Sequence, residues 1–130
     1  MKKLPIGIQT FKKLREDGYI YIDKTKQALK VIENYQYVFL SRPRRFGKSL
    51  FLDTLKNIFE GNKELFKGLY IYDKYDFKKH PVIKISFSGG IYNKEDLNEN
   101  LLHIMKVNQE KLGINCENQT NANICFLNKL

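Results

Sequence analysis

The stretch YVFLSRPRRFGKSLFLDTL, from Tyr37 to Leu55, constrains the fold of this chain more than any other part of the sequence. It begins with a continuous apolar run, Tyr37 to Leu40, which is typical of a strand covered on both faces in a parallel sheet. It ends in an amphipathic pattern that predicts a helix from Lys48, with Gly47 just before it. A strand, a glycine-containing turn and a helix N-terminus together favour a bound anion, so this order predicts a phosphate-binding turn.

The triplet Gly47-Lys48-Ser49 supplies the side chains that such a turn needs. In the pattern G-x-x-x-x-G-K-[ST], Lys48 pairs with the β and γ phosphates of a nucleotide and the Ser49 hydroxyl coordinates Mg²⁺. We therefore expect ATP and Mg²⁺ as cofactors, Ser49 as the metal ligand, and no catalytic residue among these. The predicted cofactor-binding residues are Arg44, Arg45, Phe46, Gly47, Lys48, Ser49 and Leu50.

The first glycine of that pattern is replaced here by Arg42. A residue with a Cβ atom rarely adopts a positive φ, and Pro43 has no N–H to donate. We therefore expect the early part of the turn to follow another path or to donate fewer hydrogen bonds, with the amides from Arg45 to Ser49 forming the phosphate cradle.

The positive charge of the chain is concentrated near this turn. The net charge is +9, and residues 1–50 contain 12 Lys and Arg against 4 Asp and Glu. Local basicity indicates a polyanionic partner, and both a nucleotide and a nucleic-acid backbone fit. The alternative function is thus a basic nucleic-acid-binding module that uses Lys2, Lys3, Lys12, Lys13, Arg15, Arg42, Arg44 and Arg45. A small-molecule kinase also begins with such a turn, but the sequence identifies neither an acceptor site nor a lid.

Alternating strand and helix patterns predict an α/β fold, a parallel sheet flanked by helices. The expected strands are Tyr19–Ile22, Tyr37–Leu40 and Pro81–Phe87. The expected helices are Thr10–Asp17, one capped by Asp23 that continues to Tyr35, one from Lys48 to Gly61, and one from Asn93 to Gly113.

The other candidate residues have simpler explanations. Asp73 follows the apolar run Leu69–Tyr72 and would suit a water ligand of Mg²⁺, but an edge strand explains the run equally. His80 and His103 have no ligand partner at a useful spacing. Asp23-Lys24-Thr25 would lie near the nucleotide or, as we prefer, cap a helix. The tyrosines suit half-buried packing better than base stacking.

Composition points to a cytoplasmic protein without a membrane partner. No segment approaches the roughly 20 apolar residues of a membrane span, and the N-terminal MKKLPIGIQ does not resemble a signal peptide. Cys116 and Cys125 follow no metal-ligand spacing and are interpreted as free thiols. The sequence does not indicate the oligomeric state.

Four stretches resemble the AAA-ATPase-like family of prokaryotic P-loop ATPases: FKKLREDGYIYIDKT, FLSRPRRFGKSLFLDTL, LFKGLYIYD and HPVIKISFSG. RPRRFGKS is similar to that family's form of Walker A, so Arg42 is typical of the group. The resemblance implies nucleotide binding. In the family the Walker B Asp-Glu would follow the Asn-rich region, and many members carry a C-terminal nuclease-like domain of the PD-(D/E)XK type.

This resemblance leads to an expected domain organisation. Residues 1–35 form an N-terminal lead-in of helix, short strand and helix, and residues 36–130 form an incomplete P-loop ATPase domain, truncated before Walker B. Hydrolysis would then be impaired in this chain, and whether it acts as an enzyme stays open. Nucleic acid is a further partner in the context of full-length family members.

Overall fold

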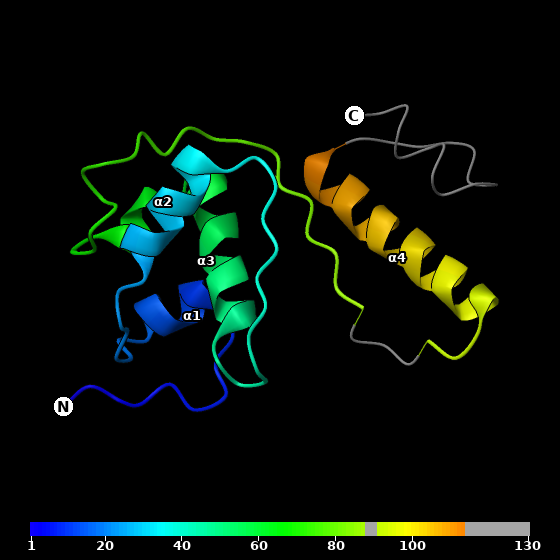
Figure 1. Ribbon diagram of the computed structural model, residues 1–130, viewed down its shortest axis with the longest axis horizontal. Coiled ribbons are helices and arrows are strands. Elements are labelled where there is room, and N and C mark those ends of the chain that lie inside the picture. The colour runs from blue at the N-terminus through cyan, green and yellow to red at the C-terminus, as the bar shows by residue number, and fades with distance from the viewer. Residues whose placement is uncertain (88–90, 114–130) are drawn as a thin grey trace. The chain divides into compact units, whose positions relative to one another are not determined.

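The computed structural model describes residues 1–87 and 91–113, and these separate into two compact units. The first unit, Met1–Val82, contains α1 (Phe11–Glu16), α2 (Thr25–Asn34), α3 (Lys48–Phe59) and the 3₁₀ turn η1 (Lys63–Phe66). The second begins at Ile83 and contains α4 (Lys94–Leu112). Figure 1 shows α3 beside both α1 and α2, which it contacts.

An aromatic cluster forms the core of the first unit. The Phe11 ring stacks on Phe66 at 4.7 Å between ring centroids and meets Tyr21 edge-on at 5.2 Å. The Phe66 ring also contacts Phe77 at 5.2 Å. Aromatic pairs at such separations stabilise a core beyond the area that they bury. The cluster of buried residues consists of Phe11, Ala28, Leu29, Ile58, Phe66, Ile71 and Phe77.

The helix predictions are confirmed, with small changes at the ends. Gly61, the expected stop of α3, adopts a φ of 76°, and Gly113 ends α4 with a φ of 67°. Asn93 caps α4 by accepting a hydrogen bond from the Asp96 amide at 2.8 Å. Asp23 lies one residue before the N-cap of α2, but its carboxylate accepts hydrogen bonds from the amide and the hydroxyl of Thr25.

The predicted parallel sheet is wrong for the residues that the structure describes, because all regular elements there are helical. The run Tyr37–Leu40, expected to be a buried strand, is exposed, with Phe39 91% accessible. Tyr19–Ile22 and Pro81–Phe87 are likewise not strands. A strand exists by pairing with a neighbour, and Ile20 makes a single backbone hydrogen bond, to the Lys3 carbonyl at 2.9 Å, in place of a ladder.

Some expectations lie outside the described residues or remain untested. Cys116 and Cys125 fall outside the described ranges. The division at residues 35 and 36 stays a prediction, and it differs from the division into compact units at Val82. Among residues 1–87 and 91–113, no helix combines the length and apolar character needed to cross a membrane.

Candidate phosphate-binding site

The chain reverses its direction before α3, and two residues of this turn have a left-handed backbone conformation. Gly47, the N-cap residue of α3, has φ 77°, and Arg45 has φ 65°. Arg42 is not in this region, so the missing first glycine carries no conformational penalty there. The sequence prediction that the early turn follows another path fits this geometry. A left-handed residue other than glycine costs of order 1–3 kcal/mol and is often found at functional sites.

The first turn of α3 has its backbone donors available. In the described part of the chain, the amides from Gly47 to Leu50 donate no hydrogen bond to another group. The N-cap side chain offers none because Gly47 has no side chain, and the first turn contains no acidic residue. Unpaired amides at the start of a 12-residue helix, aligned with its dipole, form an anion-binding end.

The Lys48 side chain folds back over this turn. Its Nζ donates a hydrogen bond to the Arg42 carbonyl oxygen at 2.7 Å, which joins the two ends of the turn. Lys48 and Ser49 are both exposed, and the Ser49 hydroxyl has no hydrogen-bond partner within the described ranges. The lysine ammonium is therefore held at the turn rather than directed into bulk solvent.

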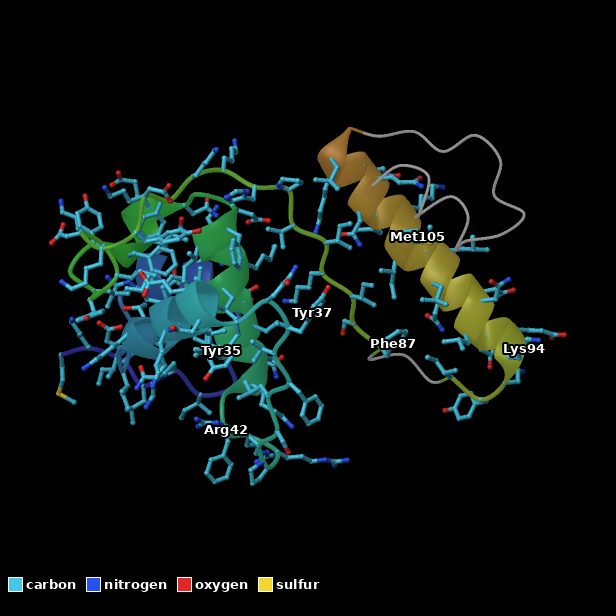
Figure 2. The ribbon with its side chains drawn as sticks, turned by 45° about the horizontal axis from the view of Figure 1, so that its top comes forward. Tyr35, Tyr37, Arg42, Phe87, Lys94 and Met105 are labelled. Atoms are coloured by element: carbon cyan, nitrogen blue, oxygen red, sulfur yellow. The ribbon has the colours of Figure 1, made fainter. Side chains whose placement is uncertain are left out.

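The seven predicted site residues are contiguous, but they do not share one role. Phe46 to Leu50 line a cavity of about 770 Å³, together with Arg42. Arg44 and Arg45 do not line it, and within the described part of the chain neither forms an ion pair. Figure 2 shows Tyr37 and Arg42 on the segment between α2 and α3. Arg44 and Arg45 thus contribute positive charge from outside the cavity.

A second part of the cavity lining, called the wall below, was not predicted from sequence. It comes from the N-terminal segment and α2, and it includes Leu4, Pro5, Ile20, Tyr21, Ile22, Lys24, Gln27 and Val31. The one sequence signal for it was the resemblance of this segment to the family's lead-in, which marked Asp23-Lys24-Thr25.

Two hydrogen bonds, one buried and one exposed, join that segment to the rest of the unit. Asp53 of α3, 5% exposed, accepts a hydrogen bond from the Phe11 amide at 2.8 Å and so caps α1. The Asp23 carboxylate accepts from the Tyr70 amide at 2.7 Å. Burial raises the pKa of Asp23, but hydrogen bonds from Thr25 and Tyr70 outweigh it and hold the pKa below its ordinary value. Asp23 was expected to be the N-cap of α2, but that position is Lys24. The Asp23 carboxylate instead joins the Thr25 amide at the start of α2 to the Tyr70 amide.

The remaining candidates do not contribute to the cavity lining. Asp73 is an exposed residue of a turn, not of a strand, and the cavity lining does not include it. The His80 ring packs edge-on against Phe59 at 6.2 Å, whereas His103 is exposed on α4. Among the described residues, no group of three His, Cys, Asp or Glu is placed to hold a metal ion. Any Mg²⁺ here would therefore depend on Ser49 and on the phosphates.

Comparison with known proteins identifies the family. The family model described as Predicted AAA-ATPase matches residues 5–129. The chain belongs to this family. It is similar to an uncharacterized protein of the vnfD 5′ region of Azotobacter chroococcum mcd 1, with 53% identity over 123 residues. That match covers 92% of this chain and 24% of the relative, so the chain spans about a quarter of the relative's length. No solved structure matches this predicted AAA-ATPase chain.

Proposed function

We propose that this chain binds the triphosphate of Mg·ATP at the turn from Arg44 to Leu50. The observation that carries the proposal is the set of unpaired amides from Gly47 to Leu50 at the start of α3. They offer donors to the phosphate oxygens, and the helix dipole favours the negative charge. Membership of a predicted AAA-ATPase family agrees with this ligand.

Two side chains complete the proposed site. Lys48 leaves the Arg42 carbonyl and pairs with the β and γ phosphates, which are stronger acceptors than a neutral carbonyl. The Ser49 hydroxyl, without a partner in the described ranges, coordinates the Mg²⁺ that bridges those phosphates. The bound cation would neutralise charge on the triphosphate.

For these 130 residues the proposal is limited to binding. Phosphoryl transfer also needs a group that orients the attacking water, and no carboxylate of the described residues lines the cavity. For the longer proteins of the family we propose that ATP hydrolysis follows binding at the same turn, with the missing carboxylates supplied elsewhere.

The competing proposal is a nucleic-acid interface formed by the basic N-terminal third. Two of the eight basic residues assigned to this interface, Arg15 and Lys12, contact other groups of the first unit. Arg15 donates to the Leu65 carbonyl at 2.8 Å and to the Lys67 carbonyl at 2.6 Å, and Lys12 pairs with Glu16 at 3.8 Å. The Arg15 contacts favour the nucleotide site over a continuous phosphate-binding surface, whereas the exposed Lys12–Glu16 pair is weak and does not discriminate.

Titration calorimetry with Mg·ATP tests the proposal on the wild type, Lys48→Ala and the control Lys30→Ala, after circular dichroism has shown that all three are folded. Lys30 is an exposed lysine of α2 outside the cavity lining. A hydrogen bond to a charged group contributes about 1.5–3 kcal/mol. Lys48→Ala should therefore weaken binding by at least about tenfold, and Lys30→Ala should not.

The dependence on salt separates the competing proposals. An interface with six to ten phosphate contacts loses about 10³–10⁵ in affinity between 50 and 200 mM salt. Binding of Mg·ATP should weaken far less over that range.

Equal affinities of the wild type and Lys48→Ala for Mg·ATP would refute the proposed function.

A further inference from the structure

The cavity extends well beyond the residues that would hold phosphates. Its volume of about 770 Å³ lies within the range of about 300–1,000 Å³ that is usual for small-molecule sites. The turn and the start of α3 supply one part of its lining and the lead-in segment with α2 another, and Val38 and Leu40 also line it. All of this lining belongs to the first unit, Met1–Val82, so the cavity is a feature of one compact body.

The lead-in side is apolar and accessible. Leu4 is 67% exposed, Ile22 is 72% exposed and Ile20 is 40% exposed. Apolar side chains gathered at the edge of a cavity mark a binding surface more often than isolated ones do. Such a wall does not suit phosphate oxygens, which need donors, but it suits the flat faces of an aromatic ring.

Three side chains of this wall are polar: Tyr21, Lys24 and Gln27. Burial raises the pKa of the Tyr21 hydroxyl, which is engaged by the backbone of Lys24 and the side chain of Thr54. By contrast, the side-chain amide of Gln27 is exposed and has no hydrogen-bond partner in the described part of the chain. An amide offers a donor and an acceptor side by side, which matches the N6 and N7 edge of adenine.

The wall is also held in place before any ligand arrives. The hydrogen bond from the Phe11 amide to Asp53 ties the helix preceding Ile20 to α3, the helix that begins at the phosphate turn. The hydrogen bonds of Asp23 fix the residue directly after Ile22. A preorganised wall loses less entropy on binding.

We propose that this wall is the base-binding side of the site, where Leu4, Ile20 and Ile22 contact the faces of an adenine ring and the Gln27 amide reads its edge. The inference rests on the proposed function, because the triphosphate at the α3 turn brings the base to the same cavity. It assigns base recognition to the lead-in segment, so the first 35 residues contribute directly to ligand binding.

Calorimetry with three ligands tests the inference: Mg·ATP, Mg·GTP and magnesium tripolyphosphate, which has no base. The variants are Ile22→Ala and Gln27→Ala, with Gln9→Ala as the control, since Gln9 is an exposed glutamine of the lead-in outside the cavity lining. Ile22 is largely exposed, so its truncation should leave folding intact.

We expect the wild type to bind Mg·ATP at least tenfold more tightly than tripolyphosphate. Ile22→Ala should weaken Mg·ATP severalfold and leave tripolyphosphate unchanged, and Gln27→Ala should reduce the preference for ATP over GTP. Gln9→Ala should behave as wild type.

Equal affinity of the wild type for Mg·ATP and tripolyphosphate would overturn the inference while leaving the phosphate site intact. Unchanged Mg·ATP binding and base preference in both cavity variants would also overturn it. If neither ligand binds the folded chain, the proposed function has failed and the inference falls with it.

Discussion

Replacing Asp53 by alanine should destabilise the first unit, because this carboxylate joins α1 to the helix of the phosphate turn. The Asp53 side chain accepts from the Phe11 amide at 2.8 Å and lies 3.4 Å from the Asn57 side-chain nitrogen. Phe11 is 0% exposed and Thr10, the N-cap of α1, provides no side-chain hydrogen bond. The variant therefore leaves a buried amide without its acceptor.

The size of the effect follows from these contacts. A hydrogen bond to a charged group contributes about 1.5–3 kcal/mol, and an orphaned buried donor costs about 1–3 kcal/mol. Because the two estimates describe the same lost contact, they are not added, and we expect a loss of about 1.5–3 kcal/mol. A unit the size of Met1–Val82 has a total stability of roughly 4–12 kcal/mol. The melting temperature should fall by roughly 10–20 °C.

Urea unfolding followed by circular dichroism measures this loss. The control is Asp73→Ala, an exposed aspartate that makes no hydrogen bond or ion pair within the described ranges, and it should change stability by less than about 0.5 kcal/mol. Asp53→Asn keeps an acceptor for the Phe11 amide and should lie between the wild type and Asp53→Ala. If Asp53→Ala is as stable as the control, the contact between α1 and α3 does not exist in solution.

Three other substitutions test separate parts of the structure. Gly47→Ala should lower the free energy of unfolding by about 1–2 kcal/mol in urea unfolding, because alanine is strained at a φ of 77°. The added Cβ meets no atom within 4 Å, so no steric clash adds to this loss. An unchanged stability would show that the turn adopts another conformation. Phe66→Ala should cost about 3–5 kcal/mol in the same assay, since Phe66 is fully buried between Phe11 and Phe77; a loss below 1 kcal/mol would contradict that packing. The pKa of Asp23 is lower in the folded state than the value of 3.8 in the unfolded chain. The ionised carboxylate therefore stabilises the fold above pH 3.8, and this contribution is lost as the pH falls through the pKa of the folded state. Asp23→Asn should therefore lose less stability than the wild type between about pH 5 and pH 2.5, and equal losses would show that the carboxylate is not hydrogen-bonded.

The helices could be predicted from the sequence because their signals are local. The apolar spacing of α3, the glycine before Lys48 and the cap at Asn93 act within one or two turns of chain. The candidate site residues from Arg44 to Leu50 come from the same local signals, and their role in phosphate binding stays a prediction. The structure adds that Arg45, rather than Arg42, takes the left-handed conformation.

The sheet could not be predicted correctly because a strand depends on partners that the local sequence does not specify. Tyr37–Leu40 has the composition of a buried strand, yet no other segment of the described residues pairs with it, and Tyr37 is 87% exposed. The cavity wall was missed for a related reason. Leu4, Ile20 and Gln27 are distant from the turn in sequence and are brought to it by tertiary contacts.

Amide chemical shifts test the central claim most directly, because the claim concerns particular backbone N–H groups. A ¹⁵N-labelled chain is titrated with Mg·ATP, and the amide resonances are followed residue by residue. We expect the largest shifts at Gly47, Lys48, Ser49 and Leu50, the amides without partners in the described structure. Unchanged resonances at these residues, with shifts confined to the surface lysines near the N-terminus, would contradict the account.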